Sequence, residues 1–176
     1  MKEILNLSRN ALVKHLQGEE VKPSEEIKKK YSAKQACFVT LTKKGELRGC
    51  IGSLYAKQEL WKDVIENSIN AGFKDTRFLP LRKGELPDIK IEISVLSIPK
   101  KLEFRNPEEL LKKINSNYGI ILQKRMNSAT FLPQVWDELP DKINFLEHLS
   151  LKAGLNKDAW KTSELWYYTV NSEKEE

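Results

Sequence analysis

The strongest constraint on the fold is a strictly alternating run near the middle of the chain. Apolar side chains occupy every second position from Ile89 to Val95, and Lys90, Glu92 and Ser94 stand between them. A period of two is that of a β-strand with one buried and one polar face. Such a strand needs partner strands and a layer of other elements over its apolar face, so the chain must build a covered sheet.

The other segments alternate between helical and extended patterns without a regular β–α–β order. Helices are predicted at 3–17, 58–73 and 141–153, with shorter ones after Pro23, Pro107 and Pro133. Strands are predicted at 36–54 as a hairpin, and at 118–124, 129–133 and 164–170. This mixture favours an α+β (mixed α/β) fold, with a mostly antiparallel sheet flanked by helices.

Length and composition indicate a globular protein. A chain of 176 residues can form one domain over 1–176, built as one body or as two lobes, and 40% hydrophobic with 31% charged residues fits a packed core. No apolar run approaches the roughly 20 residues of a membrane span, and the N-terminus lacks the apolar stretch of a signal peptide. We therefore expect a cytoplasmic protein that does not enter membranes.

The net charge of +5 raises the question of nucleic-acid binding. Lysines are interleaved with glutamates, as in "EEIKKKY" and "EELLKKI", which is typical of a solvated surface rather than a basic binding face. Two cysteines and two histidines stand without metal-ligand spacing, so no metal or other cofactor is predicted.

The segment "ACFVTLTKKGELRGCIGSL" predicts a hairpin with Lys43, Lys44 and Gly45 as its loop. In this register Leu41 pairs with Leu47, Val39 with Gly49 and Cys37 with Ile51, which makes one face apolar. The opposite face carries Phe38, Thr40, Arg48, Cys50 and Gly52. A shift by one residue would bury Arg48 among apolar groups, so the first register is preferred.

Three expectations follow for the two thiols. Cys37 and Cys50 point to opposite faces, so they should not form a disulfide, and Cys37 should be a packed core thiol. Arg48 lies about 7 Å from Cys50 along the strand, close enough to favour a thiolate. Gly52 would leave space beside that thiol, and Gly49 would let another element approach the opposite face.

Simpler interpretations stay open for the same residues. Cys50 can be an inert structural thiol, and Arg48 can hold a structural carboxylate such as Glu92. Asp75 and Arg77, in the long loop "KDTRFLPLRKGELPD", can pin that loop as an ion pair. Alternatively, Arg77 and Arg48 form a cationic pocket for a phosphate or carboxylate.

One histidine is a candidate partner for the thiol. His148 projects away from the apolar stripe of its predicted helix. It is therefore either a solvent-exposed residue or a base that reaches Cys50 across a cleft.

"LRGCIGS" resembles the signature of the AMMECR-type domain family, known in prokaryotes as AmmeMemoRadiSam system protein A. The blocks "DTRFLPL", "IEISVLS", "FLPQVW" and "LKAGL" are similar to that family's in the same order, over about residues 31–170. Residues that match its motifs are Arg48, Gly49, Cys50, Gly52, Asp75, Arg77, Phe78, Glu92, Pro133 and Trp136. Members often carry a cysteine where this chain has Ser150, which puts more weight on Cys50.

The resemblance implies a mixed α/β fold with a larger and a smaller lobe, and a cleft near the signature strand. It implies no defined reaction, and it associates the family with a Memo-like protein and a radical enzyme. We expect a binding or adaptor module for a small anionic ligand or a protein partner. A thiol-dependent enzyme is the first alternative and a nucleic-acid-associated regulator the second.

The candidate site divides into two groups. The catalytic candidates are Cys50 and His148, and the ligand-binding candidates are Arg48, Gly49, Gly52, Ser53, Asp75, Arg77 and Glu92. No metal ligand is among them. The sequence leaves the oligomeric state open.

Overall fold

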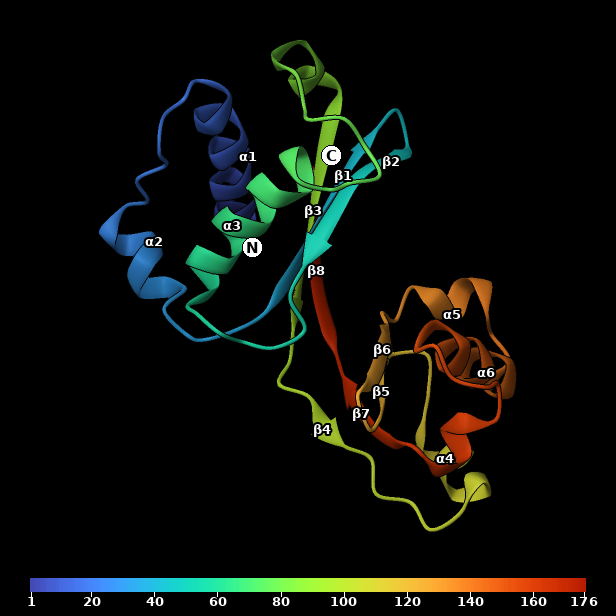
Figure 1. Ribbon diagram of the computed structural model, residues 1–176. Coiled ribbons are helices and arrows are strands. Elements are labelled where there is room, and N and C mark those ends of the chain that lie inside the picture. The colour runs from blue at the N-terminus through green and yellow to red at the C-terminus, as the bar shows by residue number, and fades with distance from the viewer. The chain divides into compact units, whose positions relative to one another are not determined.

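The computed structural model describes residues 1–176, which divide into two compact units (Figure 1). Unit 1 consists of Met1–Leu96 and Asn171–Glu176, and unit 2 of Ser97–Val170. The second unit is therefore inserted into the chain of the first. Each unit has its own four-stranded sheet and its own hydrophobic core.

Most elements of unit 1 follow the predicted pattern. The elements are α1 (Lys2–Leu16), α2 (Glu25–Lys30), β1 (Cys37–Lys43), β2 (Glu46–Gly52), α3 (Leu60–Phe73), the 3₁₀-helix η1 (Lys83–Asp88), β3 (Ile89–Leu96) and most of β8 (Val170–Lys174). Of these, η1 and β8 were not predicted. The strand order is β2-β1-β3-β8. The prediction of a mixed α+β fold is confirmed, with two antiparallel sheets instead of one.

Helices α1 and α3 cover one face of the first sheet (Figure 1). The alternating residues of β3 supply the core there, because Ile89, Ile91 and Ile93 are each at most 1% exposed. Val39 and Leu41 of β1 join the same cluster. The periodicity that predicted the strand thus also identified its buried face.

The hairpin keeps its predicted faces in β1 and from Gly49 onward in β2, but not at Leu47, and its register differs from the prediction. Val39 pairs with Ile51 and Thr40 with Cys50, two residues away from the predicted pairs, and the loop has two residues instead of three. The register breaks after Leu41, which pairs with Gly49, whereas Thr42 pairs with Leu47. Arg48 is therefore the extra residue of a β-bulge. Leu47, expected in the core, is 45% exposed.

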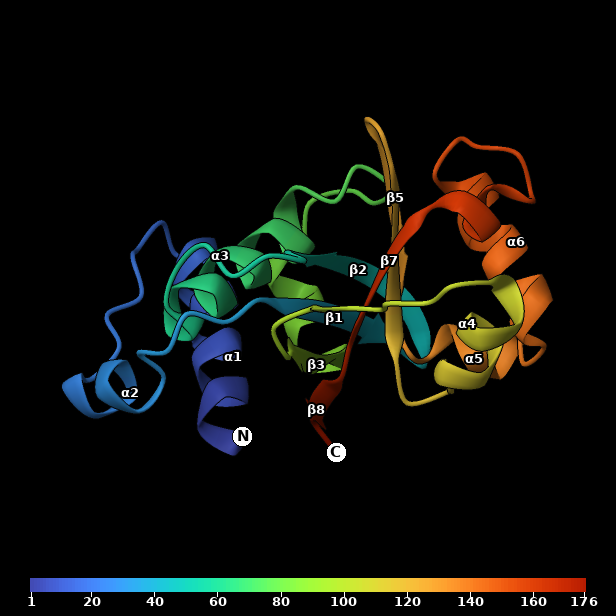
Figure 2. The ribbon, with the colours of Figure 1, turned by 90° about the horizontal axis from the view of Figure 1, so that it is seen from below.

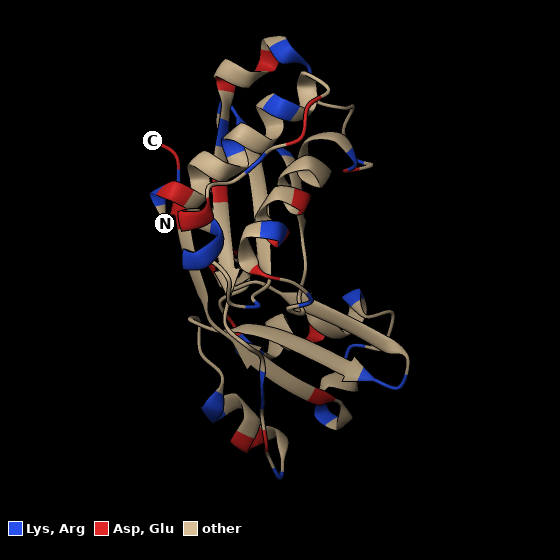
Figure 3. Ribbon diagram, turned by 90° about the vertical axis from the view of Figure 1, so that its left-hand side faces the viewer, with Lys and Arg blue, Asp and Glu red and all other residues tan.

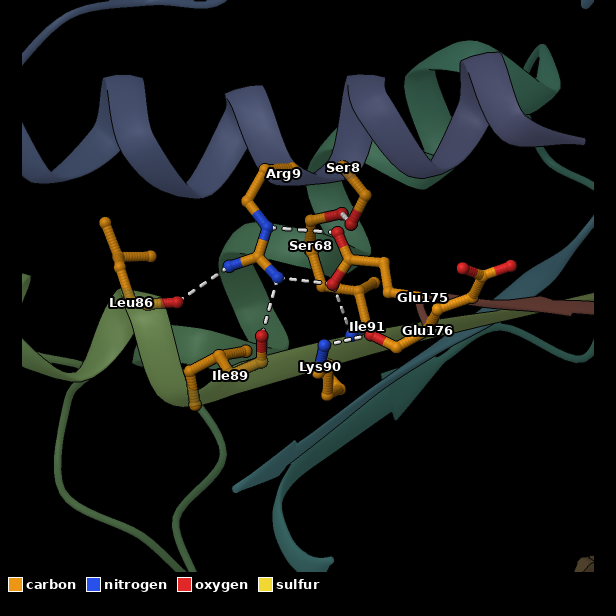
Figure 4. A network of polar contacts seen from close by, with 9 residues as sticks. All are labelled: Ser8, Arg9, Ser68, Leu86, Ile89, Lys90, Ile91, Glu175 and Glu176. Carbon is orange, nitrogen blue, oxygen red and sulfur yellow. Dashed lines mark hydrogen bonds and ion pairs between the residues drawn. The ribbon is translucent and has the colours of Figure 1, made fainter. Parts of the chain in front are cut away.

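The C-terminal strand was missed by the sequence analysis, which placed one last strand at 164–170. The chain instead continues into β8, which lies beside β3 (Figure 2). Glu175 accepts from Arg9 of α1 and, at 2.9 Å, from the N–H of Ile91 (Figure 4). Arg9 also donates to the carbonyls of Leu86 and Ile89, so one guanidinium ties three elements of unit 1 together.

Unit 2 has a regular sheet packed against helices. Its elements are β4 (Lys100–Lys101), α4 (Pro107–Lys113), β5 (Gly119–Lys124), β6 (Asn127–Phe131), α5 (Val135–Glu138), α6 (Lys142–Lys152), the 3₁₀-helix η2 (Ala159–Thr162) and β7 (Glu164–Tyr168). Asn106 and Asp141 accept from the N–H groups of Glu109 and Asn144, each at 2.8 Å, and so cap α4 and α6.

None of these helices combines the length and the apolar character that a membrane-spanning segment needs.

Candidate functional site

The side chain of Arg48 leaves the bulged strand and binds the following loop. Its Nε and Nη2 atoms each donate to the carboxylate of Glu85 at 3.1 Å, and Nη2 also donates to the carbonyl of Leu79 at 2.9 Å. The side chain is 13% exposed, and its remaining nitrogen, Nη1, is buried without a partner. These contacts direct the guanidinium to the loop and not to the Cys50 thiol.

Glu85 is the carboxylate that holds this cation, so the suggestion of Glu92 was wrong. It also accepts from Lys43 at 3.0 Å and from the N–H of Arg82 at 3.1 Å. Hydrogen bonding to Arg48 first, and then to Lys43, lowers the pKa of Glu85 to about 2 against the opposing effect of burial. The carboxylate is therefore ionised at neutral pH.

Asp75 and Arg77 form a second ion pair at the free edge of β2. Asp75 accepts from the N–H of Cys50 at 2.9 Å, and Arg77 donates to the Cys50 carbonyl at 3.3 Å. The two side chains thus satisfy both backbone groups of an edge-strand residue, much as a neighbouring strand would. Arg77 holds the pKa of Asp75 well below its ordinary range, and the interpretation as a loop-pinning pair is confirmed.

A hollow of about 570 Å³ lies beside these pairs in unit 1. Its lining contains four cationic side chains, one carboxylate and three apolar residues: Lys43, Arg48, Arg77, Arg82, Glu85, Phe78, Leu79 and Pro80. The structure therefore brings Arg48 and Arg77 to one cavity, as the pocket interpretation requires. Cys50 is not part of this lining.

Cys50 lies on the sheet face that α1 and α3 do not cover. Its Sγ atom is 3.2 Å from the hydroxyl of Thr40, which pairs with Cys50 on one side and Glu92 on the other. Thiol, hydroxyl and carboxylate thus form one row across three strands. His148 belongs to unit 2, is exposed, and bonds through Nδ1 to the Asn144 carbonyl at 2.9 Å.

The two cysteines behave as expected with respect to each other. Both are free, so no disulfide forms. Cys37 is fully buried, and burial, followed by the nearby Asp63, raises the pKa of its thiol well above the ordinary value. No group of three or more His, Cys, Asp or Glu side chains is placed to hold a metal ion.

The small residues of the motif are structural in different ways. A Cβ at Gly49 would overlap the backbone oxygen of Ala71 in α3, which confirms the predicted close approach. At Gly52 the prediction was wrong, because the ring of Phe38, not open space beside the thiol, fills the position. Ser53 bonds through its N–H to the Cys37 carbonyl at 3.1 Å.

Sequence reasoning missed three of the five charged residues that line the cavity. Lys43, Arg82 and Glu85 were not candidates, although the last two lie in the loop that its length had marked as functional. The charged residues of that loop, which flank its apolar "FLPL" run on both sides, were the available signal. The partner of Arg48 could not be chosen from several glutamates without knowledge of the loop's path.

Comparison with known proteins places the chain in a family. The AMMECR1 family model matches residues 5–174. A protein of Aquifex aeolicus is 37% identical over 98% of this chain and 90% of its own length, and one of Methanopyrus kandleri is 39% identical over 97% and 84%. The crystal structure of an uncharacterised protein from Pyrococcus horikoshii has a TM-score of 0.89 at 32% identity, covering 98% of this chain and 90% of that one. The chain therefore belongs to the AMMECR1 family.

Proposed function

We propose that unit 1 is a binding module whose hollow accepts the carboxylate or phosphate of a small anionic ligand. The observation that carries this proposal is the lining itself, in which Lys43, Arg48, Arg77 and Arg82 surround a single carboxylate, that of Glu85. A cavity of about 570 Å³ has the size of a small-molecule site. Guanidinium groups in a cavity favour carboxylate or phosphate because they donate two parallel hydrogen bonds.

The existing ion pairs leave donors for a ligand. The carboxylate of Glu85 accepts from the ammonium group of Lys43 and from Nε and Nη2 of Arg48. The carboxylate of Asp75 accepts from Nε and Nη2 of Arg77. Arg82 is exposed beside the hollow, and Nη1 of Arg48 is a buried donor without a partner. Because Nη1 of Arg48 is covered by protein atoms, the donors that an anion can reach are those of Arg82 and of Arg77, whose side chain is 55% exposed.

The charge distribution argues against a nucleic-acid surface. Lys and Arg are interspersed with Asp and Glu along the helices of both units (Figure 3). A protein that tracks a phosphate backbone would gather its cations along one face or groove. The cationic lining of the hollow is local, which suits one anionic group better than a polymer.

Titration with inorganic phosphate and with acetate, followed by NMR shifts of backbone and guanidinium N–H groups, tests the proposal. We expect saturable shifts around the hollow and an affinity that falls at least about fivefold in Arg82→Ala, since a charge-assisted bond is lost. Lys101→Ala is the matched control, because Lys101 is a half-exposed cation of unit 2 paired with Glu164.

Two results would contradict the proposal. One is the absence of saturable binding by either anion. The other is an Arg82→Ala variant that binds like Lys101→Ala. A single-stranded oligonucleotide that bound far more tightly than phosphate, with a steep salt dependence, would instead establish the nucleic-acid alternative.

A further inference from the structure

We propose that the ligand of this hollow is an amphipathic small molecule, with an apolar chain or ring attached to its anionic group. This inference rests on the proposed function and adds the substrate class to it. The anionic group would bond to the guanidinium groups of Arg82 and Arg77. The apolar part would lie against Leu79 and Pro80, which line the same hollow.

The first argument is that Leu79 is exposed in a loop whose backbone is fixed. Its side chain is 73% exposed, yet its carbonyl accepts from Arg48 at 2.9 Å. Two residues later, Leu81 is buried and its N–H donates to the Gly72 carbonyl at 2.8 Å. Pro80 stiffens the link between them. The hydrogen bonds at Leu79 and Leu81 therefore fix the backbone on both sides of Pro80, and the side chain of Leu79 points to solvent.

The second argument is the position of the charges beside this apolar surface. The guanidinium carbons of Arg48 and Arg77 lie 5.9 and 5.5 Å from the centre of the Phe78 ring, within the range of cation–π contacts. The donors and the apolar lining are therefore neighbours along one short segment. A ligand with adjacent charged and apolar parts matches both, whereas inorganic phosphate uses only the donors.

The third argument is size. A carboxylate or phosphate alone would leave most of a cavity of about 570 Å³ filled with water. Removing water from the Leu79 side chain is favourable in proportion to the apolar area covered. A ligand that extends from the donors over this leucine would gain that contribution.

A series of straight-chain carboxylates from acetate to hexanoate, measured by NMR titration of the full chain, tests the inference. We expect the affinity to rise about threefold for each added methylene group that covers apolar surface. Leu79→Ser should flatten this rise, so that hexanoate loses much more affinity than acetate does. Leu151→Ser is the matched control, because that leucine of unit 2 is 55% exposed and lies outside the hollow.

The outcomes separate the inference from the proposed function. Equal affinities for acetate and hexanoate, with acetate binding intact, overturn the amphipathic ligand but leave the anion site. No binding by any member overturns both. The affinities of N-acetyl-leucine and of an acidic pentapeptide ending in leucine are then compared. Similar affinities support a small-molecule ligand. A peptide that binds more than tenfold tighter overturns that assignment in favour of a protein partner.

Discussion

The two hairpins of the molecule are built for different purposes. In unit 2 the pairing of β5 with β6 runs without interruption from Ile120 and Phe131 to the turn, where Arg125 has a φ of 57°. In unit 1 the turn between β1 and β2 has positive φ at Lys44 and Gly45, but the pairing is broken at Arg48. The regular hairpin supplies core side chains, whereas the interrupted one turns a cation toward a loop and a cavity.

The hairpins also use glycine differently. Gly49 of β2 touches the backbone of helix α3, whereas Gly119 of β5 lies under the ring of Tyr168 on the neighbouring strand. A helix backbone cannot move aside without breaking its hydrogen bonds, but a ring can shift by small rotations. The motif strand is therefore the less tolerant of the two.

Gly49→Ala should destabilise the protein more than any of the other substitutions. The added methyl group would overlap the Ala71 carbonyl, so we expect a loss of about 3 kcal/mol or more in the free energy of unfolding, or no folded protein. Urea denaturation measures it. Gly84→Ala is the control, because nothing lies within 4 Å of a Cβ there, and its stability should stay within about 0.5 kcal/mol of wild type.

Gly119→Ala sharpens the comparison of the hairpins. Its methyl group meets a side chain, so the loss should be smaller than for Gly49→Ala. A greater loss at Gly119 would show that the buried ring of Tyr168 is the more rigid neighbour, and the contrast drawn between the two hairpins would fail.

Glu85→Gln should give an intermediate effect that depends on pH. The native pKa of about 2 lies below the ordinary 4.5, so the carboxylate contributes stability that is full above pH 4.5 and is lost as the pH falls toward 2. We expect the variant to be less stable by about 1–2 kcal/mol at pH 7, since its charge-assisted bonds are part-buried and partly screened.

The difference between wild type and Glu85→Gln should therefore shrink on acidification and vanish near pH 2. Urea denaturation at several pH values follows it. Glu164→Gln, which breaks an exposed ion pair with Lys101 in unit 2, is the control and should change little at any pH. A pH-independent difference at Glu85 would mean that packing, not charge, explains the loss.

Local patterns predicted most of the elements and the buried face of the first sheet. Alternation located β3, helical patterns located α4 after Asn106 and α6 from about residue 141, and the opposite faces of Cys37 and Cys50 were correct. These features depend on residues close together in the chain. The expectations of a single domain, a cleft between lobes, a cytoplasmic location and Memo-like or radical-enzyme partners stay predictions.

The errors have a common physical cause. Hydrophobic alternation cannot reveal the bulge at Arg48. The bulge is stabilised by the hydrogen bonds of Arg48 to Glu85, which is 37 positions away in the sequence. The strand β8 was missed since its residues are mostly polar, and its place is fixed by Arg9 at the other end of the chain. Both depend on long-range contacts that one sequence does not display.

Cys50→Ser should give the smallest effect, and it tests which side of β2 carries the function. Cys50 is half-buried beside the Thr40 hydroxyl and outside the hollow. A serine keeps this contact, so we expect a loss of stability below about 1 kcal/mol and unchanged phosphate affinity. Cys37→Ser, in the apolar core on the opposite face, should cost about 2 kcal/mol, because it buries a hydroxyl there.

The same pair of variants bears on the thiol-dependent alternative. Iodoacetamide should alkylate Cys50 in the native protein and spare Cys37, which is fully buried. Since the guanidinium of Arg48 is bound to Glu85 and Leu79, Arg48→Lys should leave that alkylation rate within about twofold of wild type. Two results would contradict this expectation: loss of phosphate binding in Cys50→Ser, or a large fall of the Cys50 alkylation rate in Arg48→Lys. Either result would show that the thiol belongs to the same site as the cationic hollow. The centre of the site would then be the sheet face that carries Cys50, and not the loop.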